Sequence, residues 1–375
     1  MRDCRLVGLR DLDHSKADTR NKVAAYLNDL IDLGVAGFRV DAAKHMWPED
    51  LSQIYSMLHD LPIASGFPEN TKAWIGQEVI GKATWKNEYK GLGAVTEFWY
   101  MYRLMDRQDS LVDFRTMIDD TKPFGKYLKD KEAFVFATNH DKQRGDHNIA
   151  SFENPRALRI ATAMLMALPY GTKRIMSSYI FTFFDQGPPD LQPGTDDMES
   201  GTCTNEWVCE HRWPGIRNLA MLSGAMNRPT SETIWQWDNG ASQLSFTSGD
   251  GFFAINNDDT TLEQDLQTAL PAGLYCNLAL DDFEGCTETL VVKQDGTAFI
   301  SIPSGADIPF VYTTLDAKIV QTTTPTSTLV CTCPHFNMFC DDGFESVIVG
   351  VLPGACGCID RECGKLFTTL VICNF

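Results

Sequence analysis

The sequence predicts an α/β domain built on a parallel sheet, followed by an antiparallel β-domain and a cysteine-rich tail. Up to residue 229, apolar runs typical of buried strands alternate with amphipathic helical runs. From residue 230 to residue 319, short alternating runs are separated by turns rich in Gly, Asn and Asp. Alternation of strands and helices is typical of a parallel sheet covered by helices, and chemistry in such sheets collects where the strands end.

The first helix is predicted at residues 18–33, because apolar residues recur there on one helical face and Gly34 follows as a stop. Further helices are expected around residues 48–60, after the third strand, at 155–168 and at 204–226. The parallel strands are expected at residues 35–40, 74–79, 94–100, 133–138 and 173–178.

Polar side chains follow three of these strands at the point where each strand ends. Asp41 ends the first strand, Glu78 ends the second, and Asn139, His140 and Asp141 end the fourth. Glycoside cleavage needs one carboxylate as nucleophile and a second, protonated one as acid, so three strand-end carboxylates have suitable types for it. Acids at strand ends also serve as helix caps or solvated loop residues, and the spacing alone leaves both interpretations open.

The second half of the sequence has the pattern of an antiparallel β-domain over residues 230–319. The alternating runs QLSFTS, GFFAIN, AFISIP and FVYTTL are separated by GDG, NNDD and QDG turns. Residues 320–329 are rich in Thr and Pro and are interpreted as a linker. The cysteine-rich tail occupies residues 330–375.

Composition limits the classes of partner. A chain of 375 residues with 43% hydrophobic content supports a packed core. The formal net charge of −18 and a pI near 4.7 disfavour nucleic acid and anionic membranes as partners, because both would be repelled. No run of about 18 apolar residues is present and the first residues are not apolar, so we expect neither a membrane span nor an export signal in this chain.

The cysteines have a distribution typical of secreted proteins. The spacings Cys203 to Cys209 and Cys276 to Cys286 suit local disulfides. Cys4 is far from any other cysteine in the sequence, which indicates that its partner belongs to sequence absent from this chain. The C-x-C spacings of the tail are compatible with zinc, but the acidic, secretory context favours disulfides.

Several segments resemble the α-amylases of glycoside hydrolase family 13. GFRVDAAKH, IGQEVI and NHDKQRG are similar to three of the four signature segments of that family, and AAKHMWP, PYGTKRIMSSY and CTNEWVCEHRW resemble its animal, chloride-dependent branch. The resemblance covers residues 1–319. It implies a partial (β/α)₈ barrel, strands 4–8, over residues 1–229, followed by a β-sandwich C-domain over residues 230–319.

The resemblance also implies a reaction and its residues. It implies endohydrolysis of α-1,4-glucosidic bonds in starch, glycogen and malto-oligosaccharides, with retention at the anomeric carbon. Asp41 would be the nucleophile, Glu78 the acid/base, and Asp141 the third carboxylate, which orients and strains the sugar. The sugar subsites would be lined by Lys44, His45, Ile80 and His140.

Two ions are implied by the same resemblance. Arg39, Asn139 and Arg174 would hold chloride, whose negative charge would raise the pKa of Glu78. The alternative for Arg39 is an ion pair with Asp41. Calcium would be held by Asp11 and by the backbone carbonyls of Arg2 and His45, all of which are hard oxygen donors.

The chain also departs from the family. Members begin about 150 residues earlier, so the first three of the eight barrel strands are expected to be missing. Lys142 stands where the family has Asn, and residues 146–151 replace a glycine-rich loop. We therefore expect an incomplete sequence of a secreted enzyme, monomeric at full length. The alternatives are a truncated, catalytically inactive amylase-like protein that binds glycans, and a different barrel glucosidase, which the animal-type segments disfavour.

Overall fold

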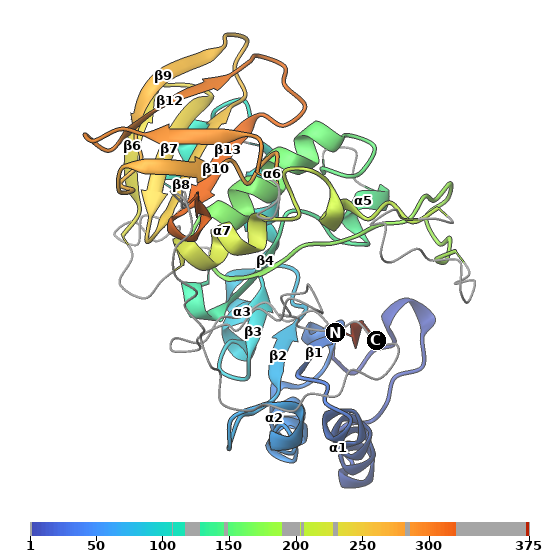
Figure 1. Ribbon diagram of the computed structural model, residues 1–375. Helices are drawn as coiled ribbons and strands as arrows, with labels where there is room; N and C mark the ends of the chain where they lie inside the picture. The colour runs from blue at the N-terminus through green and yellow to red at the C-terminus, as the bar shows by residue number, and fades with distance from the viewer. Residues whose placement is uncertain are drawn as a thin grey trace. The chain divides into compact units, whose positions relative to one another are not determined.

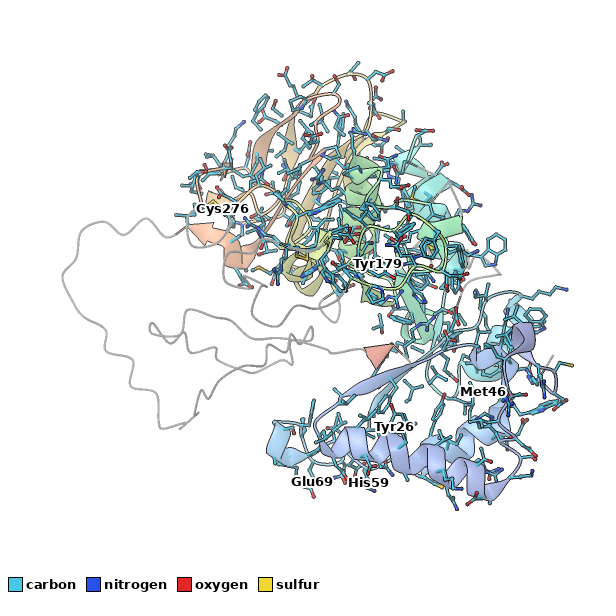
Figure 2. The ribbon with its side chains drawn as sticks, turned by 90° about the vertical axis from the view of Figure 1, so that its right-hand side faces the viewer. Tyr26, Met46, His59, Glu69, Tyr179 and Cys276 are labelled. Atoms are coloured by element: carbon cyan, nitrogen blue, oxygen red, sulfur yellow. A yellow bond between two sulfur atoms is a disulfide. The ribbon has the colours of Figure 1, made fainter. Side chains whose placement is uncertain are left out.

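The computed structural model describes residues 2–106, 108–116, 128–145, 149–189, 203, 206–227, 232–281, 286–319 and 373–374. The chain forms two compact units (Figure 1). Within the described residues, unit 1 spans residues 2–79, 84–95 and 373–374, and unit 2 spans residues 80–83 and 96–319 with the gaps given above. Figure 2 labels Tyr26 and Met46 in unit 1, and Tyr179 and Cys276 in unit 2. The predicted domain boundary at residue 229 lies inside unit 2, and the predicted linker and all of the tail except residues 373–374 lie outside the described residues.

Unit 1 is built on parallel strands in the order β15-β1-β2-β3. Its strands are β1 (Gly37–Val40), β2 (Trp74–Gln77), β3 (Ala94–Thr96) and β15 (Cys373–Asn374). Its α-helices are α1 (Ala17–Asp32), α2 (Pro48–Ser56) and α3 (Ala83–Tyr89), and its 3-10 helices are Leu6–Gly8, Ala43–His45 and Ile63–Ser65.

The core of unit 1 lies between α1 and the strands β1 and β2. Ile31 from α1 packs with Phe38 of β1 and Ile75 of β2, as the apolar face of the predicted helix requires. Gly34 has φ +98° and follows the helix, which confirms the predicted stop. A Cβ on Gly37 would lie 2.6 Å from the backbone oxygen of Trp74, so the close approach of β1 and β2 requires glycine there.

The first part of unit 2 continues the pattern of strand and helix. Its strands are β4 (Ala133–Phe136) and β5 (Thr172–Arg174), which pair in parallel. Its helices are α4 (Phe98–Asp106), α5 (Lys142–Gly145), α6 (Pro155–Ala167) and α7 (Leu219–Met226), with 3-10 helices at Leu111–Thr116, Asp130–Glu132 and Glu210–Arg212. The Asn154 side chain caps α6 by accepting the N–H of Ala157 at 3.2 Å, and β4 is buried along its whole length.

Several predicted helices and strands were longer than the observed ones. The strand expected at 94–100 ends at Thr96, because Phe98, Met101 and Leu104 recur with helical spacing and are buried on one face of α4. The strand expected at 173–178 ends at Arg174, and the helix expected at 48–60 ends at Ser56. The helix expected at 204–226 is reduced to α7 and the 3-10 turn at Glu210–Arg212, because the intervening Gly215 has φ +86°.

The second part of unit 2 is the predicted antiparallel β-domain. Its strands are β6 (Ile234–Asp238), β7 (Gln243–Ser248), β8 (Gly251–Asn256), β9 (Leu262–Gln267), β10 (Gly273–Cys276), β11 (Thr289–Val292), β12 (Thr297–Ile302), β13 (Phe310–Thr314) and β14 (Lys318–Ile319), with a 3-10 turn at Leu315–Ala317. The sheets are β13-β8-β7-β6, β12-β9 and β11-β10-β14. Side chains of all three sheets, including Phe252, Leu266 and Tyr275, share one apolar core.

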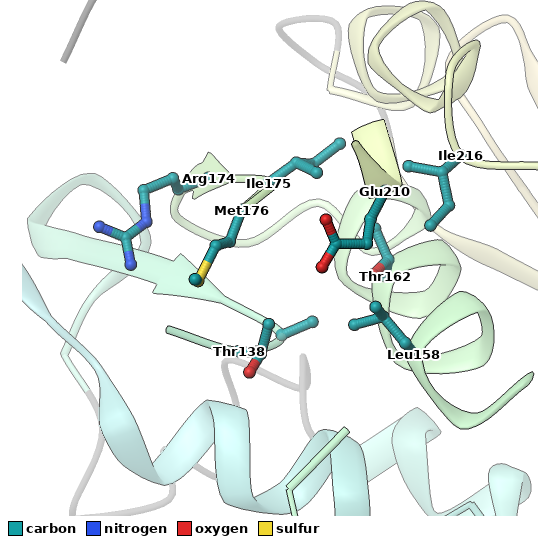
Figure 3. Close-up of a pocket in the computed structure, with 9 residues that line it drawn as sticks. Thr138, Leu158, Thr162, Arg174, Ile175, Met176, Glu210 and Ile216 are labelled. Atoms are coloured by element: carbon teal, nitrogen blue, oxygen red, sulfur yellow. The ribbon is translucent and has the colours of Figure 1, made fainter. Parts of the chain in front are cut away.

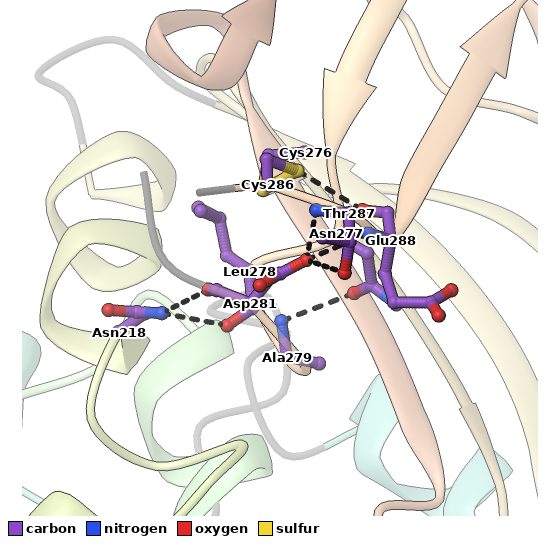
Figure 4. Close-up of a disulfide and its surroundings, with 9 residues drawn as sticks. All are labelled: Asn218, Cys276, Asn277, Leu278, Ala279, Asp281, Cys286, Thr287 and Glu288. Atoms are coloured by element: carbon purple, nitrogen blue, oxygen red, sulfur yellow. Dashed lines mark hydrogen bonds between the residues drawn. A yellow bond between two sulfur atoms is a disulfide. The ribbon is translucent and has the colours of Figure 1, made fainter. Parts of the chain in front are cut away.

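Two disulfides have the predicted pairing, Cys203–Cys209 and Cys276–Cys286. Beside the second one, the carboxylate of Asp281 accepts the hydroxyl of Thr287 at 2.8 Å (Figure 4). Cys4 is exposed and pairs with no other described cysteine. Counted along the chain, five parallel strands followed by the antiparallel β-domain confirm the predicted fold class, a partial barrel and an all-β C-domain.

No helix within the described part of the chain combines the length and the apolarity that crossing a bilayer requires.

Candidate active site

Three of the predicted residues meet where β1 and β2 end in unit 1. The two strands run in parallel with Arg39 opposite Gly76, so Asp41 and Glu78 both follow directly after their strands. One guanidinium nitrogen of Arg39 lies 2.7 Å from the Asp41 carboxylate and another lies 3.3 Å from the Glu78 carboxylate. Arg39 is buried, the Asp41 side chain is 53% exposed, and the Glu78 side chain is 9% exposed. The arginine therefore joins an exposed carboxylate to a buried one.

The pKa of Glu78 is raised above the usual value for a glutamate. Its burial is the largest cause, since desolvation disfavours the charged form. The backbone N–H of Ala42, which donates to Glu78 at 2.8 Å, and the charge of Arg39 oppose the rise, while the charge of Asp41 and a hydrogen bond shared with it add to it. A carboxyl group with a raised pKa keeps its proton to higher pH, as a general acid must.

The hydrogen bond from Ala42 to Glu78 depends on an unusual backbone conformation of Ala42. It has φ 47° and ψ 30°, in the left-handed region that alanine rarely adopts, and this turn directs its N–H at Glu78. The sequence gives no sign of this contact, because nothing in an alanine side chain indicates a left-handed conformation. Backbone strain at this position accompanies a contact to the buried carboxylate.

Lys44 and His45 belong to the 3-10 turn that follows Ala42. The ammonium of Lys44 lies 5.8 Å from the centre of the Trp85 ring, within cation–π range. His45 lines a cavity of about 300 Å³ together with Trp47 and Met46. Both residues lie within a few positions of Asp41 along one turn.

The three residues predicted to hold calcium line that same cavity. Arg2, Asp11 and His45 are joined there by Asp3, Asp13 and Asp50. The Arg2 guanidinium is directed to the Glu88 carboxylate at 2.7 Å, so calcium binding would rest on backbone oxygens and the Asp11 carboxylate. That donor set suits calcium, although within the described residues no three His, Cys, Asp or Glu side chains come together as a metal cluster.

The segment after β4, which ends at Phe136 rather than at the predicted residue 138, carries other predicted residues of the site in unit 2. Asn139 is buried, and its side-chain oxygen accepts the N–H of Lys142 at 2.8 Å, which fixes the start of α5. The His140 ring nitrogen lies 3.6 Å from the Asp141 carboxylate, and both side chains are nearly half exposed. Ile80 packs against the cluster formed by Phe98, Met101, Phe136 and Ile149.

Arg174 lies at the end of β5, next to β4. Its guanidinium lies over the rings of Phe136 and Phe134, at 5.1 Å and 5.6 Å from their centres. Figure 3 shows Arg174 beside a small cavity of about 10 Å³, which is also lined by Thr138 and Glu210. A volume of this size is comparable to one water molecule. Arg39 makes the ion pair that was the alternative to a chloride contact, so the chloride site remains a prediction.

The chain has clear relatives. It is 41% identical over 332 residues to the α-amylase-related protein of Drosophila sechellia, which covers 85% of this chain and 66% of that protein. The structure of wild-type α-amylase I from Eisenia fetida superposes with a TM-score of 0.72 at 37% identity, over 84% of this chain and 68% of the earthworm chain. The chain belongs to the animal-type α-amylases. The model of the α-amylase C-terminal all-β domain matches residues 235–308.

The chain matches only part of the length of its relatives. The chain spans about two thirds, 66%, of the length of the Drosophila sechellia α-amylase-related protein. A glutamate-to-glutamine mutant of the earthworm α-amylase I in complex with maltohexaose has the same TM-score of 0.72, at 36% identity.

Besides Ala42, Arg144 is a second residue near the site that the sequence did not reveal. It follows Asp141 by three positions and holds the loop after β5, and only the fold brings those segments together.

Proposed function

We propose that the protein hydrolyses α-1,4-glucosidic bonds in starch, glycogen and malto-oligosaccharides with retention of configuration. The observation that carries this proposal is the asymmetry of the two carboxylates at the ends of β1 and β2. Glu78 is buried and has a raised pKa, whereas Asp41 is half exposed and contacts Arg39 at 2.7 Å. Environments that separate two carboxyl groups in this way assign one as acid and the other as nucleophile.

The chemistry runs in two displacements. Glu78 gives its proton to the glycosidic oxygen while Asp41 attacks the anomeric carbon, so the bond to the leaving sugar breaks as a glycosyl–Asp41 bond forms. Ionised Glu78 then takes a proton from water, and the resulting hydroxide displaces Asp41 from the sugar. Two inversions at one carbon give net retention.

Substrate entry must separate the two carboxyl groups. They share a hydrogen bond here, whereas retaining glycosidases hold them about 5 Å apart. The Asp41 side chain is 53% exposed, so it has room to turn toward a sugar without disturbing the core. Asp141 and His140, both partly exposed after β4, are proposed to hydrogen-bond the sugar at the cleaved bond, and Lys44, His45 and Ile80 to line its subsites.

Calcium and chloride are proposed as resident ions. Asp11 with the carbonyls of Arg2 and His45 would hold calcium, which supplies a structural link between segments distant in the sequence. Arg39, Asn139 and Arg174 would hold chloride, which supplies negative charge and favours the protonated form of Glu78. The two local disulfides support an extracellular location for the protein.

Release of reducing ends from starch tests the proposal. Because the chain spans about two thirds of the length of its relatives, the assay is run on the chain itself and on a chimera that adds the unmatched part of the earthworm enzyme. Glu78→Gln and Asp41→Asn should each lower kcat by at least ~10²-fold, since each removes half of the acid–nucleophile pair. The matched control Glu69→Gln changes an exposed carboxylate on a loop and should leave kcat unchanged.

The alternative is a glycan-binding protein without catalysis. It predicts that wild-type chain and chimera bind maltohexaose but release no reducing ends. If Glu78→Gln keeps more than about a tenth of wild-type turnover, the assignment of the acid is wrong, because loss of such a group costs at least ~10²-fold.

A further inference from the structure

The loop that follows β5 presents apolar side chains to solvent. Ile180, Phe183 and Phe184 are 49%, 61% and 55% exposed. Figure 2 labels Tyr179, at the start of this loop. Leaving apolar area in water forgoes about 25 cal/mol per Å², so several such residues gathered in one loop indicate an interaction site.

This loop is held in one conformation by Arg144. One guanidinium nitrogen donates to the backbone oxygens of Phe184, at 2.7 Å, and Gln186, at 2.8 Å. The other bonds the hydroxyl of Tyr179. The guanidinium also lies over the rings of Tyr179 and Phe181, at 5.0 Å and 4.6 Å. Five contacts from one partly buried arginine side chain hold the loop in place.

The aromatic residues of the loop divide into an inner and an outer set. Phe181 packs edge to face on Phe152 at 5.6 Å, and Tyr179 packs in the same way on Trp207. The side chain of Gln186 accepts the N–H of Thr182 at 2.7 Å and closes the loop. The inner rings anchor the loop, so Phe183 and Phe184 are presented outward on a rigid support.

The loop adjoins the residues proposed to hold the sugar in unit 2. Strands β4 and β5 are parallel neighbours, so the segments after them leave the sheet at the same edge. The N–H of Arg144 donates to the backbone oxygen of Asp141 at 3.2 Å. A Cβ on Gly145 would lie 3.4 Å from the Phe184 ring, so that ring rests on the turn that carries Asp141.

We propose that Ile180, Phe183 and Phe184 form a stacking platform for a distal glucose unit of an α-glucan whose reacting bond lies at Asp141. This rests on the proposed function and adds a subsite to it. A pyranose ring has an apolar C–H face that matches an exposed aromatic ring, and a glucan chain extending from Asp141 would reach a platform that rests against the turn after β4. The net charge of −18 repels anionic lipid and nucleic acid, which disfavours them as occupants.

Calorimetric titration with maltohexaose and maltotriose tests the platform in a Glu78→Gln background, where no hydrolysis occurs. The double variant Phe183→Ala/Phe184→Ala should bind maltohexaose about tenfold more weakly, as expected for a hot-spot contact, and bind maltotriose unchanged. The control Phe299→Ala removes an equally exposed ring, 57%, from the β-domain and should leave both affinities unchanged.

The outcomes separate this inference from the proposed function. If the parent chain binds neither sugar, both are overturned. If the double variant binds maltohexaose as the parent does, the platform alone is overturned. If the double variant keeps the parent's sugar affinity but no longer forms a dimer that the parent forms in sedimentation, the surface serves self-association instead. If it keeps the sugar affinity but no longer binds phosphatidylcholine vesicles that the parent binds, the surface binds lipid instead.

Arg144 is then a positioning residue with its own test. Arg144→Gln should increase amide hydrogen exchange in residues 179–186 and weaken maltohexaose binding as the double variant does. Arg144→Lys retains the charge but not the forked geometry, so it should give an intermediate result. Faster exchange with unchanged maltohexaose affinity would show that the ordered loop takes no part in binding.

Discussion

An arginine lies at the end of each of two parallel strand pairs, β1 with β2 and β4 with β5, and the two arginines have different surroundings. After β1 and β2, Arg39 contacts the carboxylates of Asp41 and Glu78 at 2.7 Å and 3.3 Å. At the end of β5, the Arg174 guanidinium lies over two aromatic rings, while Asp141 after β4 remains nearly half exposed. Similar topology therefore gives a buried charged pair in one place and a cation on apolar rings in the other. The first environment changes protonation, and the second mainly places a positive charge.

Removing each arginine should separate the two environments most clearly. Arg39→Leu removes a buried guanidinium that contacts both the Asp41 and the Glu78 carboxyl groups, and it should lower the free energy of unfolding at neutral pH by about 3 kcal/mol. Arg174→Leu loses a cation–π contact and should cost about 1 kcal/mol. Denaturant unfolding at pH 7 measures both. If both variants lose the same free energy of unfolding, the contacts of Arg174 with aromatic rings stabilise the fold as much as the contacts of Arg39 with the carboxyl groups do.

Chloride tests whether the two arginines act together. In the chimera, removing chloride should lower the pKa of Glu78, deprotonate the acid at neutral pH and move the activity optimum toward acid, with little change in affinity for starch. Arg174→Gln should reduce this response, since the amide cannot supply the lost positive charge. A pH–rate profile that is identical with and without chloride would contradict the anion site.

The raised pKa of Glu78 also sets the sign of a stability change with pH. The folded chain holds the Glu78 proton more tightly than the unfolded chain does, so this group's contribution to stability is fully present below the unfolded pKa of about 4.5 and is lost as pH rises through the folded pKa. The free energy of unfolding of wild type minus that of Glu78→Gln should therefore fall as the pH rises above about 4. If this difference rises with pH instead, the contacts of Glu78 with Arg39 and Ala42 lower its pKa by more than burial raises it.

The smallest effect concerns the backbone beside the first carboxylate. Ala42 has φ 47°, so Ala42→Gly should relieve left-handed strain and raise the free energy of unfolding by about 0.5 kcal/mol, after allowing for the extra freedom of glycine in the unfolded chain. The adjacent control Ala43→Gly is buried in the 3-10 turn and should lower it by about 1 kcal/mol. Thermal unfolding measures both changes. If Ala42→Gly also lowers the free energy of unfolding, as Ala43→Gly does, the backbone at Ala42 is not strained.

Local patterns were sufficient for much of the fold. The apolar face of α1 and the stop at Gly34, the positions of Asp41 and Glu78 directly after their strands, and both local disulfides follow from residue types and spacing, which act over a few positions of the chain. Boundaries failed where two patterns overlap. Phe98 continues an apolar strand-like run, yet it opens a helix because its face is buried with Met101.

Tertiary structure decided what the site residues do. Sequence placed Arg39 two positions from Asp41, but only the pairing of β1 with β2 brings Glu78 to the same guanidinium and buries it, which is what raises its pKa. Likewise, the N–H of Ala42 and the grip of Arg144 on the loop after β5 depend on segments 36 and 40 residues apart. Residue type and local spacing determine which groups are available, whereas desolvation and charge–charge contacts arise only when distant segments pack together.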